Sequence, residues 1–427
     1  MFGFISKNKK SKHPKKNDSF FEMETTKQVS NKNLYSIASV YKDSKALHHQ
    51  EKIKKIRQDK PISPTCIQVD LEAFCNDNCS FCTTRKENGY NNEMLKLLQI
   101  NGKKERENLD EHRPIGIRSK ISQLDSTMAY SLPEMMVKAH IPTIELTGGG
   151  EPTLWPAFDT LIQNLAKKNI EIGIITNGSN ISKFRAKLVA RNCTWIRFSM
   201  DASNQDLHKK IHRTPNYDFD KRINSIKNII KSRNKRIVTG ISFVITPLNV
   251  LDIEESCKFY KRIGVDYIRF TWIYDKTGNG GFSNDEINYM KKLLSKCKGK
   301  YDGESFEVIY DNYRVEMYSR PNNDFVKCHM QKFVWSIGAN GMVYPCCIQK
   351  CNSSFEMGNI QEKTLQQIVE DQFTIQKMND LDPLNCNPCW LREKNKMIDR
   401  VVSADNNTDT SLVSNYDIRK PLHVNFV

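Results

Sequence analysis

The chain of 427 residues contains no apolar run approaching the roughly 18 residues that a membrane-spanning helix needs. Its first residues, Met1 to Lys7, lack the apolar stretch of a secretory signal. We therefore expect a cytoplasmic protein. The apolar fraction of 38% can still form a sizeable core, and the length allows one large domain with a smaller one.

The sequence also lacks the even cysteine count of a disulfide framework. It has 13 cysteines, and the reducing cytosol disfavours disulfides. Thiolates favour soft metals and iron–sulfur clusters, so metal ligation is the leading interpretation. Three cysteines, Cys193, Cys257 and Cys297, fall in helix or strand patterns and are expected to be small core residues.

The net charge of +16 is unevenly distributed along the chain. Residues 1–60 contain 14 Lys and one Arg against six Asp and Glu. This composition is typical of a solvated, flexible arm. Binding of nucleic acid or another polyanion is the alternative, but no aromatic residues lie between Lys7 and Lys16 to support it.

The periodicity of residues 61–275 predicts alternating strands and helices. Helical faces appear at Phe158, Leu161, Ile162 and Leu165, three and four residues apart. Six such units favour an α/β fold with a parallel sheet, here a partial (β/α)6 TIM-like barrel with its chemistry at the carboxyl ends of the strands. The candidate strands are Cys66–Ala73, Ile141–Thr147, Ile170–Thr176, Trp195–Met200, Val238–Thr246 and Tyr267–Trp272.

Other segments depart from this alternation. Residues 83–135 are polar and are interpreted as an insertion or lid. Residues 276–327 are expected to form a bridging segment, with one helix near Asp285–Lys298. A small cysteine-rich domain is expected over 328–395 and a polar C-terminal tail over 396–427.

The first cysteine group follows the first candidate strand. Cys75, Cys79 and Cys82 have the spacing C-x3-C-x2-C. Three thiolates so close together can bind three irons of a cubane cluster and leave the fourth iron open, and an open coordination position separates catalytic from structural metal sites. A zinc knuckle is the alternative, although zinc sites usually need a second ligand pair and none lies nearby.

This spacing, with Phe81 before the last cysteine, resembles the signature of the radical S-adenosylmethionine (radical SAM) family. Further resemblances follow in family order, in Thr147 to Pro152, in Ile175 to Gly178, at Ser199 and at His212–Arg213. The resemblance implies that S-adenosylmethionine chelates the open iron of a [4Fe–4S] cluster. The residues expected to contact this ligand are Phe81 (adenine), Gly149 and Gly150 (backbone approach), Glu151 (ammonium), Asn177, Ser199 (ribose or carboxylate side) and Arg213 (carboxylate).

The second cysteine group has the pattern C-x12-G-x4-C…C-x2-C. Its members are Cys328, Cys346, Cys386 and Cys389, and Gly341 is the glycine. The pattern resembles the auxiliary-cluster domain called SPASM, or its shortened form, twitch. Because no cysteine follows Cys389, we expect one auxiliary [4Fe–4S] cluster held by these four residues. A four-cysteine zinc site is the alternative, and Cys347 or Cys351 could substitute as a ligand.

Between these cysteines, Thr364 and Gln367 are spaced as a capping box that opens a helix. Such a helix is also typical of the SPASM family.

The resemblance implies reductive cleavage of S-adenosylmethionine and hydrogen abstraction, with flavodoxin or ferredoxin as electron donor. A single auxiliary cluster favours net oxidation of a small molecule such as a sugar or cyclitol. The alternatives are a maturase that modifies a ribosomal peptide or protein, and a non-catalytic iron–sulfur or zinc protein that binds nucleic acid. The molybdopterin-precursor cyclase is disfavoured, because that type usually ends in Gly-Gly and this sequence ends in Asn-Phe-Val.

Overall fold

The computed structural model describes residues 43–82, 123–233, 237–273, 282–310, 325–386, 389–403 and 421–427. Residues 1–42 of the arm expected over residues 1–60, and most of the insertion expected over residues 83–135, lie outside these ranges. None of the helices in the described ranges has the length and hydrophobicity that a bilayer-spanning helix requires.

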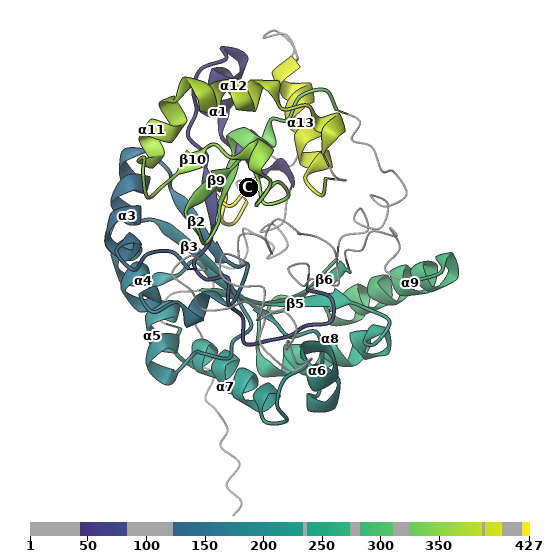
Figure 1. Cartoon of the computed structure of the whole chain (residues 1–427). Coiled ribbons are helices and arrows are strands. Elements are labelled where there is room, and N and C mark those ends of the chain that lie inside the picture. The colour runs from purple at the N-terminus through teal and green to yellow at the C-terminus, as the bar shows by residue number, and fades with distance from the viewer. Residues whose placement is uncertain are drawn as a thin grey trace, which may run out of the picture. The chain divides into compact units, whose positions relative to one another are not determined.

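The six strands predicted from the sequence are all present and parallel, and they alternate with helices (Figure 1). The strands are β1 (Cys66–Asp70), β2 (Thr143–Thr147), β3 (Glu171–Thr176), β4 (Trp195–Ser199), β5 (Val238–Ile245) and β6 (Tyr267–Trp272). The helices are α3 (Met128–Lys138), α4 (Phe158–Lys167), α5 (Lys183–Asn192), α6 (Gln205–His212), α7 (Asp218–Lys231) and α8 (Ile253–Ile263). The α/β fold with a partial barrel is therefore confirmed.

The bridging segment adds to this sheet. Helix α9 (Asn284–Tyr301) begins at a capping box formed by Ser283 and Glu286, and it leads to β7 (Glu307–Tyr310). Strand β7 pairs in parallel with β6, so the segment extends the barrel. The alternation of strand and helix therefore continues beyond residue 275, where the sequence indicated that it stops.

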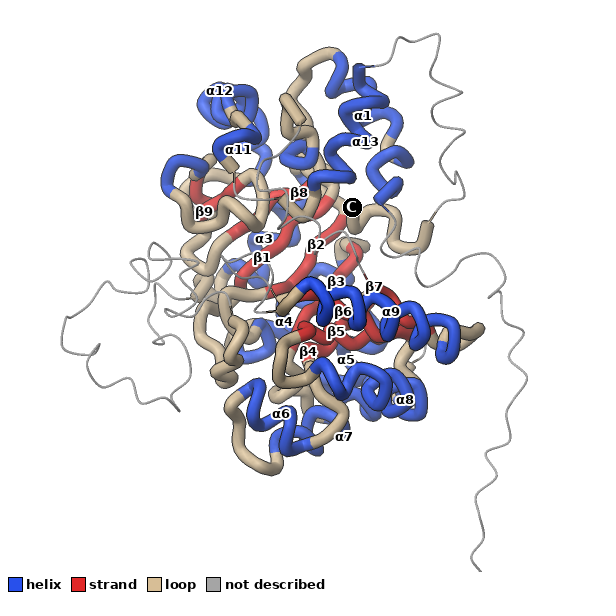
Figure 2. The backbone as a smooth tube through the Cα atoms, turned by 90° about the vertical axis from the view of Figure 1, so that its right-hand side faces the viewer, coloured by secondary structure: helices blue, strands red, loops and turns tan. Residues whose placement is uncertain are grey.

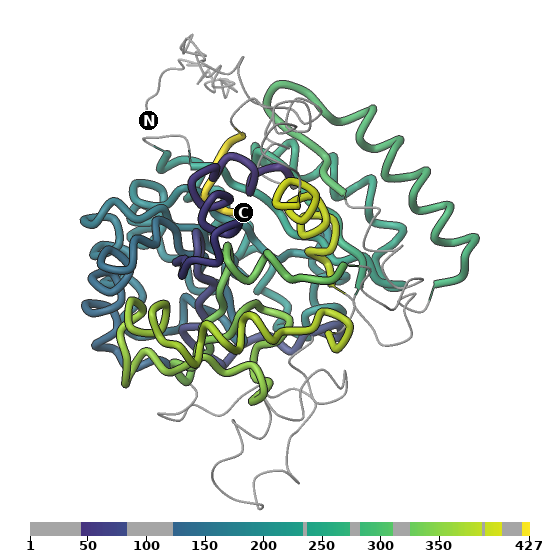
Figure 3. The backbone as a smooth tube through the Cα atoms, turned by 90° about the horizontal axis from the view of Figure 1, so that it is seen from above, coloured from purple at the N-terminus to yellow at the C-terminus, as the bar shows by residue number. Residues whose placement is uncertain are grey.

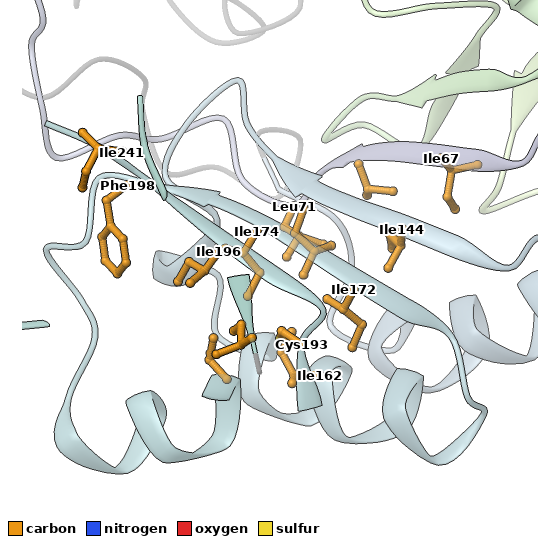
Figure 4. Close-up of a cluster of buried hydrophobic side chains, with 14 of the residues drawn as sticks. Ile67, Leu71, Ile144, Ile162, Ile172, Ile174, Cys193, Ile196, Phe198 and Ile241 are labelled. Atoms are coloured by element: carbon orange, nitrogen blue, oxygen red, sulfur yellow. The ribbon is translucent and has the colours of Figure 1, made fainter. Parts of the chain in front are cut away.

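The outward-facing residues of the strands pack against the helices. Because successive strand residues point to opposite faces, one face of each strand can be wholly apolar. Figure 4 shows Ile144, Ile172, Ile174 and Ile196 on this face, near Ile162 of α4. The four strand isoleucines are fully buried, and this layer holds the strand ends at fixed positions.

Large side chains close the amino end of the barrel interior. The rings of Trp195 and Tyr267 point to positions where the neighbouring strands carry glycine. A Cβ atom at Gly173 would lie 2.2 Å from the ring of Trp195, and one at Gly240 would lie 1.9 Å from the ring of Tyr267. Only glycine leaves room for these rings, so the lower barrel is a packed core.

The chain ends complete this closure. Helix α1 (Gln50–Arg57) buries Ile53 and Ile56, and it follows a 3-10 helix, Asp43–His48. Lys45 donates hydrogen bonds to the carbonyl oxygens of His423 (3.0 Å) and Phe426 (2.9 Å). Figure 3 shows this first described segment, in purple, beside the yellow C-terminal residues. Residues 43–57 and 421–427 are thus folded parts of the protein, whereas the sequence suggested an arm and a tail there.

The cysteine-rich region continues the same sheet. Its strands are β8 (Val334–Ile337), β9 (Met342–Tyr344) and β10 (Gly358–Asn359), and its helices are α11 (Leu365–Glu370), α12 (Gln372–Asp380) and α13 (Arg392–Ser403). Strand β8 pairs in parallel with β1, which joins this region to the barrel edge (Figure 2). The capping box of Thr364 and Gln367 is confirmed at the start of α11.

Candidate functional site

The loops that carry the family motifs follow neighbouring strands. The cysteine loop follows β1, the glycine loop follows β2 and Asn177 follows β3. Because β1, β2 and β3 are adjacent and parallel, their carboxyl ends meet at one edge of the sheet. Side chains 102 residues apart in sequence come within hydrogen-bond range there, as the 3.9 Å separation of Asn177 Nδ2 and Cys75 Sγ shows.

The glycine loop lies directly against the chain that leads to the cysteines. The amide of Gly150 donates to the carbonyl of Glu72 (2.9 Å), and that of Glu151 donates to the carbonyl of Phe74 (3.0 Å). A Cβ atom at Gly150 would lie 2.1 Å from the oxygen of Phe74. Glycine is therefore required at position 150. The adjacent Gly149 is buried.

Glu151 connects the ends of β2 and β3. Its buried carboxylate accepts hydrogen bonds from the amide and hydroxyl of Thr153 (3.1 and 2.6 Å), from the hydroxyl of Thr176 (2.6 Å) and from the amide of Asn177 (2.7 Å). Burial raises the pKa of Glu151, although these hydrogen bonds oppose the shift. The sequence did not indicate this bracing role, and contact with a ligand ammonium stays a prediction.

The cysteine loop is held by its own backbone and by Asn177. Cys75 Sγ accepts from the amide of Asp77 (3.4 Å), and Asn177 Nδ2 donates to Asn76 Oδ1 (2.9 Å). Burial raises the pKa of the Cys75 and Cys79 thiols, and the charge of Asp77 adds to the shift at Cys75. Without metal these thiols are protonated, and metal coordination would supply the thiolate form.

A buried charged network supports this loop from behind. Asp77, Cys79 and His212 bring one ligand atom each within 4.8 Å of one another. Arg222 forms a salt bridge to Asp77, and His212 lies 3.0 Å from a carboxylate oxygen of Asp201. The sequence motifs assigned no role to Asp77, Asp201 or Arg222, and His212 entered only as the neighbour of Arg213. A charged residue inside the cysteine spacing, as Asp77 is, was the available signal.

The other residues predicted to contact S-adenosylmethionine differ in their burial and in their neighbours. Ser199 is half-buried at the end of β4 and pairs in register with Ser242. The ring of Phe81 meets the ring of His212 edge-on at 6.2 Å. Arg213 ends α6 in a left-handed conformation (φ 53°), and its side chain is exposed. The roles expected of Phe81, Ser199 and Arg213 stay predictions.

The second cysteine group converges on one small cavity. Cys328, Cys346, Cys386 and Cys389 all line it, whereas Cys347 and Cys351 do not. Burial raises the pKa of Cys328 to about 11 and that of Cys346 to about 12, so bound metal would again supply the thiolates. The structure thus brings together the four residues that the sequence selected.

The sulfur spacing in this cavity bears on the choice between zinc and an iron–sulfur cluster. Tetrahedral zinc with Zn–S bonds of about 2.3 Å holds its sulfurs about 3.8 Å apart. No three of these four cysteines, all within the described residues, place their sulfurs within 4.8 Å of one another. A four-iron cluster needs wider ligand spacing than one ion does, so this donor set fits the cluster better.

The barrel interior contains polar residues that sequence reasoning missed. Strand registers place Gln68, Glu145, Arg197, Ser242 and Arg269 on the inward face, where they are half-buried. Gln68 Nε2 donates to Glu145 Oε2 at 3.1 Å. The sequence signal for these residues was a polar residue within an otherwise apolar strand. Successive strand residues point to opposite faces, so such a residue lies on the face opposite the apolar core.

Comparison with known proteins agrees with this geometry. The radical SAM superfamily model matches residues 72–260, and the SPASM iron–sulfur cluster-binding domain model matches residues 328–390. Similar relatives include the probable GTP 3',8-cyclase of Methanococcus aeolicus, which is 23% identical over 72% of this chain and 89% of its own. Mycofactocin maturase MftC of Mycobacterium tuberculosis is 27% identical over 37% of this chain and 41% of its own.

Among solved structures, Streptococcus suis SuiB bound to precursor peptide SuiA has a similar fold. Its TM-score is 0.56 at 14% identity, and the match covers 78% of this chain and 71% of SuiB. The matched domains imply S-adenosylmethionine, a [4Fe–4S] cluster and auxiliary iron–sulfur binding. The chain belongs to the radical SAM superfamily and carries a C-terminal SPASM domain.

Proposed function

We propose that this radical SAM enzyme abstracts a hydrogen atom from a polar substrate held in the barrel, and that the net reaction is a two-electron oxidation. The observation that carries the proposal is the position of the cysteine, glycine and Asn177 loops at the carboxyl edge of a barrel with a polar interior. The substrate would therefore lie directly beneath the predicted S-adenosylmethionine site.

We assign Cys75, Cys79 and Cys82 to the [4Fe–4S] cluster and the second cysteine group to one auxiliary cluster. When bound, the clusters supply one-electron chemistry, in which the first delivers the electron that cleaves S-adenosylmethionine and the auxiliary one can accept an electron from the substrate. The chain positions the reactants: Asn177 steadies the cysteine loop, and Glu151 holds the strand ends. An exogenous flavodoxin or ferredoxin would supply the electrons.

The barrel interior favours a substrate that forms hydrogen bonds. Arg197 and Arg269 lie on the strands that flank β5, and Glu145 with Gln68 lies on β2 and β1. Trp195 and Tyr267 fill the amino end of the barrel, so a substrate would lie toward the carboxyl ends of the strands and would be limited in size. A small polar molecule satisfies both conditions. The relatives give no support for a sugar or cyclitol in particular, so the proposal is limited to the polar class.

A peptide or protein maturase is the second candidate. It is favoured by the fold shared with SuiB, whose solved structure contains a precursor peptide, and by the similarity to MftC. A peptide could present one polar side chain to the same interior. The nucleic-acid alternative rests on the basic segment before residue 43, outside the described residues. Binding through that segment would weaken steeply with salt.

The central test is formation of 5'-deoxyadenosine by the reconstituted enzyme with a strong reductant. We expect Cys79→Ser to abolish it, because one iron loses its ligand. Arg213→Ala should weaken S-adenosylmethionine binding and leave the iron content intact. The matched control is Lys209→Ala, at an exposed position of α6. Full cleavage by the Cys79→Ser variant would refute the proposal.

The net reaction is tested with substrate deuterated at the target carbon. An oxidation transfers deuterium to 5'-deoxyadenosine, with one equivalent formed per product. The Cys386→Ala variant should still transfer deuterium but form little oxidised product. Return of deuterium to the product, or catalytic use of S-adenosylmethionine, would indicate an isomerase.

A further inference from the structure

His212 contacts Cys79 and Asp77 of the cysteine loop on one side and the buried carboxylate of Asp201 on the other. Its Nδ1 atom is 3.2 Å from Cys79 Sγ and 3.1 Å from Asp77 Oδ2. Its Nε2 atom is 3.0 Å from Asp201 Oδ2. The side chains of His212, Asp77 and Asp201 are at most 2% exposed, so water does not compete for these contacts.

This geometry determines the hydrogen-bonding role of the ring. An ionised carboxylate only accepts hydrogen bonds, and one carboxylate faces each ring nitrogen. Nδ1 faces the Asp77 carboxylate and the sulfur of Cys79, which is a thiolate when it binds metal, and both of these groups accept hydrogen bonds. Nδ1 therefore carries hydrogen and shares it between them. His212 is thus a donor to this sulfur.

The ring is also fixed in place. The amides of Asn78 and Ser80 donate to the carbonyls of His212 and Ile211 (both 3.0 Å), which joins the end of α6 to the cysteine loop. Arg222 binds Asp77 through two nitrogens, with Nη1–Oδ2 at 2.8 Å. The ring of His208 stacks on His212 at 4.2 Å.

We propose that His212 is a positioning residue that donates a hydrogen bond to Cys79 and thereby raises the reduction potential of the S-adenosylmethionine-binding cluster. The inference rests on the assignment of Cys79 as a cluster ligand. Reduction adds negative charge to the cluster and its thiolates, and a donor fixed at a ligand sulfur stabilises that charge. The cluster is then easier to reduce with the electron that cleaves S-adenosylmethionine.

A mononuclear metal ion held by Asp77, Cys79 and His212 is the rival interpretation. It would require Nδ1 without its hydrogen and a metal cation close to the guanidinium of Arg222. Asp77 is already bound through both oxygens by that guanidinium. The arrangement therefore favours the donor role.

The test is an EPR-monitored potentiometric titration of the holoenzyme, in which the relevant cluster is the one whose signal changes when S-adenosylmethionine is added. For His212→Leu we expect the reduction equilibrium to shift about tenfold, or ~59 mV lower for one electron. His212→Asn keeps a donor and should shift less. The control is Lys209→Asn, at an exposed position of the same helix, which should leave the potential unchanged.

An unchanged potential in a His212→Leu protein that retains all its iron would overturn the inference. If His212→Leu does not load the cluster, His212→Phe, which also lacks a donor, takes its place in the titration. Stoichiometric Zn²⁺ binding by the apo-protein that is lost in both Asp77→Asn and His212→Asn would also overturn it, in favour of the mononuclear site. Full iron content in Cys79→Ser would instead contradict the ligand assignment itself.

Discussion

Lys350 of the cysteine-rich region forms a salt bridge with Asp70, the last residue of β1, with Nζ and Oδ2 separated by 2.5 Å. Lys350 follows Cys346 by four residues, and Asp70 precedes Cys75 by five. The pair therefore connects the two segments that carry the candidate cluster ligands. Asp70 is 1% exposed and Lys350 14%, so the pair is largely shielded from solvent.

Breaking this pair should be costly, because Lys350→Met leaves a buried carboxylate without its counter-ion. We expect a loss of about 3–5 kcal/mol, and Asp70→Asn in the same chain should recover most of it. The measurement is urea unfolding of the four proteins in the double-mutant cycle. Lys363→Met removes a partner from the exposed pair with Asp371 and should cost less than about 1 kcal/mol. Independent, additive effects of Lys350 and Asp70 would contradict the link.

Anaerobic reconstitution should load about eight irons per chain, since two four-iron clusters are expected. Replacing Cys386 and Cys389 by Ala should lower the count to about four, because half of the ligands in the auxiliary cavity are lost. Elemental analysis measures both iron and zinc. Cys347→Ala is the control and should keep the full count, because this residue does not line the cavity. Zinc in place of the second cluster would favour the structural zinc site.

Two truncations should show whether residues 1–42 and residues 43–60 contribute differently to folding and activity. Deleting residues 1–42 should leave cluster loading and S-adenosylmethionine cleavage close to wild type. Deleting residues 1–60 also removes Ile53 and Ile56, which pack against α13 and the amino end of the barrel. We expect this longer deletion to reduce soluble yield and iron content. Equal behaviour of the two truncations would show that residues 43–60 are dispensable.

Lys45 should make stability depend on pH. Burial lowers the pKa of Lys45 to about 7, whereas a lysine in the unfolded chain titrates near 10.4. Between these values the unfolded state binds more protons, so the contribution of Lys45 to the free energy of unfolding rises with pH.

Lys45→Met should remove this slope. Urea midpoints at pH 7 and pH 9 measure it. The control is Lys54→Met, because the Lys54 side chain is 62% exposed. An unchanged slope in Lys45→Met would contradict the assignment, even if the variant is less stable at both pH values.

The sequence alone determined the order of strands and helices in the barrel, because hydrophobic periodicity is local. It also selected Cys328, Cys346, Cys386 and Cys389, because a spacing motif is visible without a fold. The sequence did not show how far the barrel extends beyond the sixth strand. Strand β7 is only four residues long, and its membership depends on pairing with β6.

Only the tertiary structure decided which residues support those motifs. His212 reaches Cys79 because α6 returns to the cysteine loop, and Asp70 meets Lys350 because β8 pairs with β1. The same holds for Lys45, which looked like one charge of a basic arm and is buried beside the C-terminal residues. Contacts between distant segments depend on how helices and strands pack, and no short pattern in a sequence records that packing.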